Sequence, residues 1–164
     1  MKNIAIIGNS AVTLVGFRLD LIKQLVQQGY NVYAFSPLFT EPLREQVRMA
    51  GGTPVHFEIS RSGMNPLSEL GVVISLSRLL TLYSIDTTLT YFIKPVIYGT
   101  IAAKLAGVKN VNGMIAGLGY AFTNDLSGSM EPKRLIIKKI VERLFKFTLR
   151  WNRKVFFQNP DDLN

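Results

Sequence analysis

The sequence predicts an α/β protein built on a doubly wound parallel sheet with helices on both faces, which is a three-layer arrangement. Short apolar runs typical of buried strands alternate along the chain with longer segments that carry helical periodicity. Glycine or proline stands at most of the junctions between these segments. The chain has 164 residues, of which 48% are hydrophobic. This composition suits one folded domain with a full core and argues against disorder.

Each of the first five predicted strands is followed by a predicted helix, and after the sixth the run Asn159-Pro160-Asp161-Asp162 predicts the start of a further helix. We expect strands over residues 4–8, 32–36, 54–59, 86–92, 108–115 and 155–158. We expect helices over residues 17–28, 40–50, 66–84, 95–106 and 131–151. Repeated strand–helix units with right-handed crossovers produce a parallel sheet. Residues 9–16 are then expected to form a loop between the first strand and the first helix.

Particular residues mark several of these boundaries. Leu21 and Leu25 share the apolar face of the first helix, and Gly29 closes it. Pro95 suits the first turn of a helix, where a missing N–H costs nothing, and Gly107 is a suitable C-cap for the same helix.

Composition limits where the protein works and what it binds. The chain has no cysteine, which excludes disulfides and thiolate metal sites and fits a reducing compartment. The apolar run 4–7 is too short for a signal peptide, and the run 70–82 is too short to span a bilayer. We therefore expect a cytoplasmic protein. The formal net charge of +8 predicts attraction to polyanions, whether nucleic acid, anionic lipid or phosphorylated small molecules.

A basic stripe is predicted on the last helix. Its members follow i, i+4, i+7, i+11, i+14 spacing: Lys139, Arg143, Lys146, Arg150 and Arg153. Apolar residues are expected on the opposite side: Ile137, Ile140, Val141, Leu144 and Trp151. The stripe is either an ordinary solvated helix face or a surface for an anionic membrane or another polyanion. Nucleic acid is not expected, because the glycine-rich loops carry few cations interleaved with aromatic residues.

The first loop is not a dinucleotide-binding fingerprint. Gly8 and Gly16 lie eight residues apart with no G-x-G-x-x-G between them, and the second strand ends at Ser36 without a carboxylate for a ribose hydroxyl. A nucleotide-dependent epimerase or reductase is therefore a weaker alternative. Gly16 and Arg18, at the predicted start of the first helix, could offer N–H groups and a guanidinium to a phosphate. A turn glycine beside a solvated arginine explains the same residues, and both interpretations stay open.

The stretch 91–123 places two further candidates just beyond the carboxyl ends of strands, where α/β sheets bind ligands. Lys94 follows one strand, and a glycine-rich loop follows the next: Gly117, Leu118, Gly119 and Tyr120. Glycine there lets a backbone approach a ligand closely. No pair of carboxylates suggests a nucleophile with its acid partner, so the sequence indicates no catalytic residue.

Four segments carry a family resemblance over nearly the whole chain: residues 17–19, 91–99, 115–123 and 157–161. The combination of Lys-Pro-x-x-Tyr-Gly with Gly-Leu-Gly-Tyr resembles the amino-terminal half of bacterial GT-B retaining glycosyltransferases. Those that build capsule, O-antigen and other surface polysaccharides on lipid carriers are the most similar. The resemblance implies two Rossmann-like domains facing a cleft, with the acceptor in the amino-terminal one and most of the nucleotide-sugar donor in the other.

Several expectations follow from this resemblance. Residues 1–158 form the acceptor-side domain, and residues 159–164 begin the connection to a carboxyl-terminal donor-binding domain. The donor is a nucleotide-diphospho-sugar, expected to be UDP-linked, and the acceptor is a polyprenyl-linked or other glycan. Gly16 and Arg18 lie near the donor phosphates, and Lys94 with the loop 117–120 faces the cleft. No cofactor or metal is expected. The basic stripe holds the domain on the inner face of the cytoplasmic membrane.

The expected activity is transfer of a hexose or N-acetylhexosamine by the longer protein, while the 164-residue chain alone is inactive. Alternatives are a non-catalytic membrane-associated subunit and a polyanion-binding Rossmann-like module.

Overall fold

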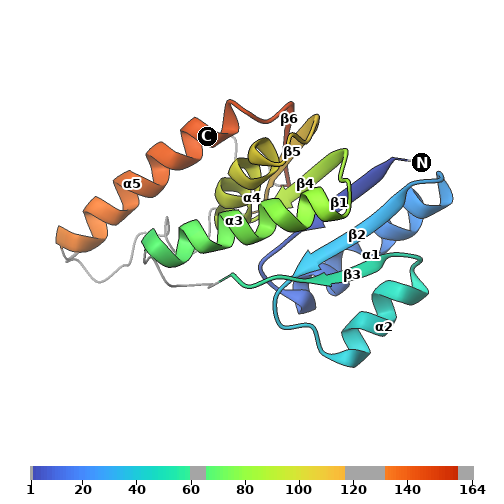
Figure 1. Cartoon of the computed structure of the whole chain (residues 1–164). Helices are drawn as coiled ribbons and strands as arrows, with labels where there is room; N and C mark the ends of the chain where they lie inside the picture. Colours follow the sequence, from blue (N-terminus) through green and yellow to red (C-terminus); the bar gives the residue numbers. More distant parts are fainter. Residues whose placement is uncertain (1, 60–65, 117–131, 159–164) are drawn as a thin grey trace.

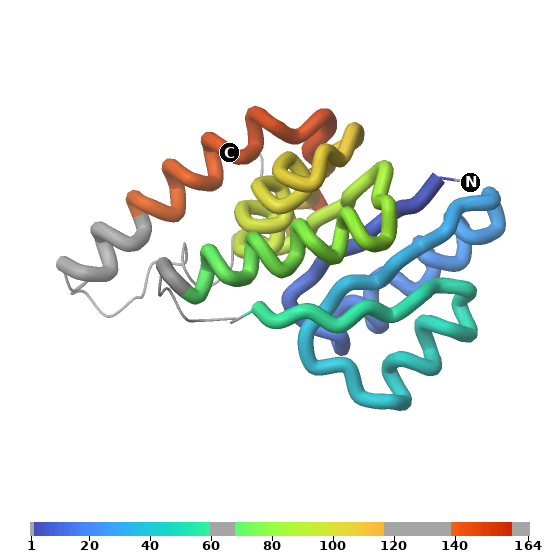
Figure 2. The backbone as a smooth tube through the Cα atoms, in the orientation of Figure 1, coloured from blue at the N-terminus to red at the C-terminus, as the bar shows by residue number. Residues whose placement is uncertain are grey.

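A computed structural model describes residues 2–59, 66–116 and 132–158, with the side chains of 66–67 and 132–138 excepted. The six strands form one parallel sheet in the order β3-β2-β1-β4-β5-β6. The tube in Figure 2 follows the chain outward from β1 to β3 and then back past β1 to β4. This order confirms the predicted doubly wound, Rossmann-like sheet.

The strands and helices alternate as the sequence predicts. The strands are β1 (Asn3–Ile7), β2 (Asn31–Ser36), β3 (Thr53–His56), β4 (Thr87–Tyr91), β5 (Asn110–Ile115) and β6 (Lys154–Phe157). The helices are α1 (Ala11–Gln27), α2 (Glu41–Met49), α3 (Pro66–Leu82), α4 (Ile93–Leu105) and α5 (Pro132–Leu149).

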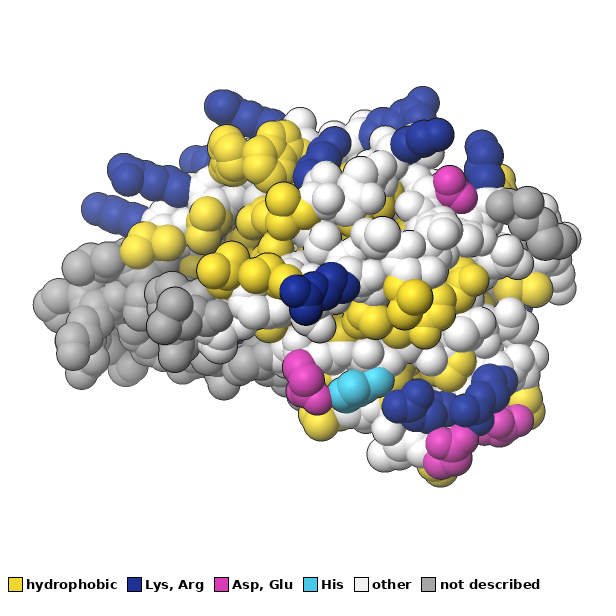
Figure 3. Space-filling model, viewed as in Figure 1, with side chains coloured by type: hydrophobic (Ala, Val, Ile, Leu, Met, Phe, Trp, Pro, Cys, Tyr) yellow, Lys and Arg dark blue, Asp and Glu magenta, His cyan; other side chains and the backbone are white. Residues whose placement is uncertain are grey.

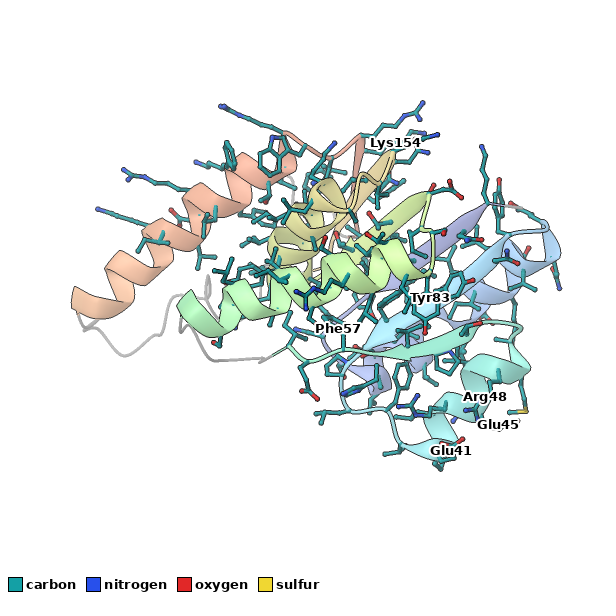
Figure 4. The ribbon with its side chains drawn as sticks, viewed as in Figure 1. Glu41, Glu45, Arg48, Phe57, Tyr83 and Lys154 are labelled. Atoms are coloured by element: carbon teal, nitrogen blue, oxygen red, sulfur yellow. The ribbon has the colours of Figure 1, made fainter. Side chains whose placement is uncertain are left out.

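Helices cover both faces of the sheet (Figure 1). α1 and α2 lie on one face, where their apolar residues pack with Ile6, Val32 and Ala34. α3, α4 and α5 lie side by side on the other face. There Phe35 contacts Phe57 and Tyr83 edge to face, with ring centroids 6.5 and 6.0 Å apart, beneath α3 (Figure 4). The apolar faces of both helical layers are thus buried against one sheet.

The start of α1 differs from the prediction. The helix begins at Ala11, so the expected loop 9–16 is wrong and the loop is only Gly8–Ser10. Ser10 is the N-cap, and its hydroxyl oxygen accepts a hydrogen bond from the Thr13 N–H at 3.4 Å. β-branched residues and Gly16 in the first two turns lower the helix propensity, which explains the error. Burial of Ala11 and Leu14 against the sheet outweighs that propensity.

The outer part of the α1 face is only partly covered. Met114 on β5 pairs in register with Phe156 on β6, and Met114 packs among the residues of the α1 face. Phe156 is 46% exposed. The helix α5 that follows β5 packs on the opposite face, with Phe145 against Val155. The β6 end of the α1 face therefore presents apolar surface.

Candidate functional site

The carboxyl ends of all six strands meet at one edge of the sheet because the strands are parallel. The chain runs from β1 toward β2 and β3 in one direction and from β4 toward β5 and β6 in the other. β1 and β4 are neighbours, so the order reverses between them. Ligands of open α/β sheets bind beyond the carboxyl ends of strands at such a reversal. In this protein Gly8–Ser10 and Phe92 lie there.

A close contact joins these two connections. Gly8 donates its N–H to the Phe35 carbonyl at 3.0 Å, and its Cα lies against the phenol of Tyr91. A Cβ on Gly8 would overlap the Tyr91 hydroxyl. Tyr91 is buried at the end of β4, and burial raises its pKa to about 12, although the nearby Arg18 charge acts in the opposite direction. The phenol is therefore neutral at physiological pH.

Arg18 reaches from α1 over the ends of three strands. Its guanidinium carbon lies 5.0 Å from the centroid of the Tyr91 ring, which is a cation–π contact. One terminal nitrogen lies 3.1 Å from the Met114 sulfur and 3.4 Å from Oε1 of Gln158, which follows β6. Nε is buried without an acceptor. The other terminal nitrogen donates to the Phe17 carbonyl at 3.2 Å. None of these partners carries a negative charge, so this guanidinium retains capacity for an anion.

Gly16 does not have the backbone role that the sequence predicted. It lies inside α1, where each N–H bonds to a carbonyl of the preceding turn, so the expected free N–H groups at Gly16 are wrong. The first turn of α1 instead begins at Ala11 and Val12, next to Gly8–Ser10. Gly16 is exposed, and an added Cβ would meet nothing within 4 Å.

Lys94 occupies the first turn of α4, directly after the strand β4. Between strand and helix stands Phe92, whose φ of 68° is unusual for a bulky residue and costs of order 1–3 kcal/mol. The tight turn puts Lys94 at the positive end of the α4 dipole, an unfavourable place for a cation. Strained backbone of this kind clusters at functional sites.

Glu69 compensates the charge of Lys94. Its Oε1 lies 2.7 Å from the Lys94 Nζ, and the two side chains are only 8% and 15% exposed. Glu69 belongs to the first turn of α3, so the pair joins the amino-terminal ends of two neighbouring helices. Tyr98, one turn further along α4, has its pKa raised to about 12 by burial and by the Glu69 carboxylate.

The sequence did not indicate Glu69 as a site residue. The available signal was a carboxylate in the first turn of a helix whose other residues are mostly apolar. Arg18 and Lys94 were predicted, and both lie at the carboxyl edge. Arg18 reaches it on the α1 face, whereas Lys94 contacts α3 on the opposite face. The structure thus places the two cations on either side of the β4 end. Gly117, Leu118, Gly119 and Tyr120 lie outside the described residues.

The predicted basic stripe on α5 is exposed along the helix (Figure 3). Lys139, Arg143, Lys146 and Arg150 all face solvent. Arg153 is also exposed, but it lies beyond the end of α5. Its guanidinium donates to Oδ1 of Asn110 at 2.6 Å, so Arg153 does not extend the helical stripe.

The sequence predicted the apolar residues of α5 on the side opposite the cations, but not all of them lie there. Val141 packs inward with Phe145 and Leu149. Four others lie on the surface along one flank of the helix: Ile140, Leu144, Phe147 and Trp151, with exposed fractions of 50%, 36%, 50% and 37%. The Phe147 and Trp151 rings are 4.6 Å apart. The side chain of Ile137 lies outside the described residues. Helical periodicity puts this apolar flank between the buried face and the cations.

Neither a membrane-crossing helix nor a metal cluster is present in the described part. None of the helices within residues 2–59, 66–116 and 132–158 is long and apolar enough to cross a bilayer. Within the same ranges, no three His, Cys, Asp or Glu residues are grouped as metal ligands.

Comparison with known proteins identifies the class. The profile described as "Glycosyl transferase 4-like" matches residues 3–159. The chain belongs to this glycosyltransferase family, and it corresponds to the amino-terminal half of a GT-B enzyme.

Among characterised relatives, the chain is 24% identical over 159 residues to a transferase from Campylobacter jejuni. That protein is an N,N'-diacetylbacillosaminyl-diphospho-undecaprenol alpha-1,3-N-acetylgalactosaminyltransferase. The match covers 97% of this chain and 40% of the relative, so the chain spans less than half of the relative's length.

Two solved structures share the fold. MurG of Acinetobacter baumannii superposes with a TM-score of 0.64 at 16% identity, covering 98% of this chain and 42% of MurG. The calicheamicin glycosyltransferase CalG4 gives a TM-score of 0.56 at 11% identity, covering 100% of this chain and 49% of CalG4. At such identities the likeness concerns the fold alone.

Proposed function

We propose that this chain is the acceptor-side domain of a nucleotide-sugar-dependent glycosyltransferase that acts on a lipid-linked acceptor in surface polysaccharide synthesis. The family match over residues 3–159 carries the proposal. The relative from Campylobacter jejuni, named for a diphospho-undecaprenol substrate and N-acetylgalactosaminyl transfer, supports an N-acetylhexosamine or hexose as the transferred group. Family membership also favours this function over the epimerase or reductase alternative.

The proposed transfer breaks the bond between the anomeric carbon and the donor phosphate oxygen and forms a bond from that carbon to an acceptor hydroxyl oxygen, whose proton passes to the departing diphosphate. Negative charge then develops on the departing diphosphate. Two features suit a phosphate near the β1–β4 reversal: the Arg18 guanidinium, whose described hydrogen-bond partners carry no negative charge, and the first turn of α1 at Ala11 and Val12. Lys94 suits the transfer side of the cleft, together with residues 117–120. Gly16 has no side chain, so it leaves space for a ligand beside α1.

We further propose that α5 rests on the cytoplasmic membrane surface. A helix that lies in a bilayer interface presents apolar and aromatic residues beside cations. The exposed Phe147–Trp151 pair and the neighbouring Lys146 and Arg150 have this arrangement. In Figure 3 Lys and Arg side chains line the upper edge, and hydrophobic side chains gather beside them. The enzyme would thereby meet a polyprenyl-linked acceptor at the inner face of the membrane.

A second candidate is a non-catalytic, membrane-associated subunit or polyanion-binding module. The excess of cations on α5 is the observation that favours it. Vesicle flotation measures the electrostatic contribution of α5 to membrane binding. We expect binding to rise with the anionic lipid content of the vesicles and to fall when Lys139, Arg143, Lys146 and Arg150 are replaced by Gln. Binding that ignores anionic lipid contradicts the electrostatic part.

A transfer assay tests the function directly. We expect a longer gene product that contains this chain to move labelled N-acetylhexosamine from a UDP-sugar to a lipid-diphosphate-linked saccharide. Arg18→Met should lower the rate at least tenfold, while Lys23→Met should not, because Lys23 is an exposed α1 residue paired with Asp20. Equal rates for both variants would remove Arg18 from the site. No transfer with any UDP- or GDP-sugar would leave the subunit interpretation in place.

A further inference from the structure

Phe92 has a backbone conformation that is ordinarily reserved for glycine. Its φ of 68° and ψ of 156° crowd a Cβ, and such strain persists only where the surrounding structure holds the residue in place. Phe92 stands between β4 and α4, and its carbonyl accepts a hydrogen bond from the Val96 N–H at 2.9 Å. A glycine would make the same turn without strain, so the presence of a large side chain calls for a reason.

The positive φ decides on which face of the sheet the Phe92 ring lies. Side chains of an extended strand alternate between the two faces. Thr90 faces α4, since a Cβ on Gly99 of that helix would meet its methyl group at 2.7 Å. Tyr91 packs on the α1 face. Continued alternation would return Phe92 to the α4 face, but Phe92 also packs on the α1 face. The strained turn thus brings two consecutive aromatic side chains together, with ring centroids 5.0 Å apart.

Tyr91 is held at two points by this arrangement. Gly8 lies against its hydroxyl, and the ring of Phe92 lies beside its own ring. The Tyr91 ring in turn faces the guanidinium of Arg18, whose central carbon is 5.0 Å from the ring centroid. Contacts therefore run without a break from the strained turn through Tyr91 to Arg18.

The orientation of Arg18 depends on that ring. The hydrogen-bond partners of its guanidinium are the Met114 sulfur, Oε1 of Gln158 and the Phe17 carbonyl, and none of them carries a charge that would fix the cation. An aromatic face attracts a guanidinium and sets the plane on which it lies. A cation that is fixed before charge develops stabilises that charge without reorganisation, so the direction of the Tyr91 ring matters for the phosphate site.

We propose that Phe92 is a positioning residue for Arg18 and acts through the ring of Tyr91. The inference rests on the proposed function, because it concerns the guanidinium that would meet the departing diphosphate. Phe92 itself touches no substrate. The strain at its backbone places its ring behind Tyr91, and Tyr91 then presents Arg18 to the β1–β4 reversal.

A kinetic double-mutant cycle in the longer gene product tests whether Phe92 acts through Arg18. We expect Phe92→Ala to lower kcat/KM for the nucleotide sugar by at least about threefold. In the Arg18→Met background the same change should cause no further loss, because the residue that Phe92 positions is gone. Phe92→Tyr keeps the ring and should keep the rate. A residue that served only as core packing would slow both backgrounds equally, and that result would overturn the proposal.

The Arg18 Nε–H resonance of the 164-residue chain gives a readout that does not depend on transfer. Nε is buried, and no acceptor for it lies among the described residues, so its proton should exchange slowly and be shielded by the Tyr91 ring. Its loss in Arg18→Met assigns the resonance. Phe92→Ala should move it toward the position of a free arginine and speed its exchange. An unmoved resonance contradicts the proposal.

Phe39→Ala is the matched control. Phe39 is also partly buried on the α1 face, and it contacts Arg44 rather than Arg18, with 5.3 Å between the guanidinium carbon and the ring centroid. Its replacement removes a similar ring but should leave both the Arg18 resonance and the transfer rate unchanged. Equal effects of Phe39→Ala and Phe92→Ala would show a general loss of packing and would overturn the proposal.

Phe92→Gly separates the strain from the ring. Glycine ordinarily destabilises a protein relative to alanine, but at this φ it relieves the strain that alanine keeps. We expect Phe92→Gly to have a Tm at least as high as that of Phe92→Ala and to transfer as slowly. A lower Tm for Phe92→Gly would show that the turn is unstrained and would remove the first step of the inference.

The two proposals fail in different ways. Additive kinetics or an unmoved Arg18 resonance would refute the role of Phe92 and leave the glycosyltransferase function standing. Absence of transfer by every protein, together with a displaced Arg18 resonance in Phe92→Ala, would refute the proposed function and leave Phe92 as the residue that orients Arg18.

Discussion

The pair Glu69–Lys94 allows a prediction with a definite magnitude. Both side chains are largely buried, with exposed fractions of 8% and 15%, and their charged atoms are 2.7 Å apart. Replacing Lys94 with Met keeps the length of the side chain but leaves the Glu69 carboxylate buried without its cation. Removing one partner of a buried pair costs about 3 kcal/mol or more. For a chain of this size that lowers Tm by roughly 6–12 °C.

A double-mutant cycle measures the interaction. Glu69→Gln and Lys94→Met should each destabilise, whereas the double variant should recover most of the loss because no buried charge remains. Urea unfolding of the four proteins gives the free energies, with equal m-values as the control for an unchanged denatured state. Costs below about 0.5 kcal/mol for both single variants would show that the pair behaves as a solvated surface bridge and would refute the reasoning.

Three further predictions concern the β1–β4 reversal and α5. Gly8→Ala should destabilise the protein by about 1–3 kcal/mol, since the added Cβ overlaps Tyr91. Gly16→Ala should stabilise it by up to about 1 kcal/mol, because the added Cβ meets no atom and alanine favours a helix over glycine. Urea unfolding measures both changes, and the opposite signs would contradict the packing. The folded pKa of Tyr91, about 12, exceeds its unfolded value near 10, so the stability that this group contributes is present below pH 10 and is lost as pH rises from 10 to 12. The slope for this phenol is about 1.4 kcal/mol per pH unit at most, and Tyr91→Phe should flatten it; an unchanged slope would contradict the burial argument. Phe147→Ser with Trp151→Ser should weaken vesicle binding at a modest loss of stability, since both rings are only partly exposed and burial contributes about 25 cal/mol per Å². Unaltered flotation would remove the aromatic pair from the membrane contact.

The alternation of strands and helices could be predicted because each element has a local signal. Apolar runs mark the strands, and residues such as Gly29 and Pro95 mark the helix ends. The strand order β3-β2-β1-β4-β5-β6 has no comparable local signal. The predicted start of α1 was wrong because β-branched residues and Gly16 lower the helix propensity of its first two turns, although Ser10 acts as the N-cap.

The site was predictable only where it follows directly from the strand ends. Lys94 comes just after β4, so its place at the carboxyl edge followed from the strand prediction. Its partner Glu69 stands 25 residues earlier, on a different helix. Only the packing of α3 against α4 brings the two amino-terminal turns together. The exposed flank of α5 was likewise missed, because periodicity shows which residues share a face and not how much of that face a neighbour covers.

A thermal-shift panel tests the central claim, that this half holds the acceptor while the donor binds largely elsewhere. The ligands are UDP, GDP, their sugars and a short-chain lipid-diphosphate N-acetylhexosamine, each tested on the 164-residue chain and on a longer gene product. The account predicts that the acceptor analogue stabilises both forms, whereas one nucleotide class stabilises only the longer form. Clear stabilisation of the 164-residue chain by a nucleotide sugar, without any response to the acceptor analogue, would contradict it.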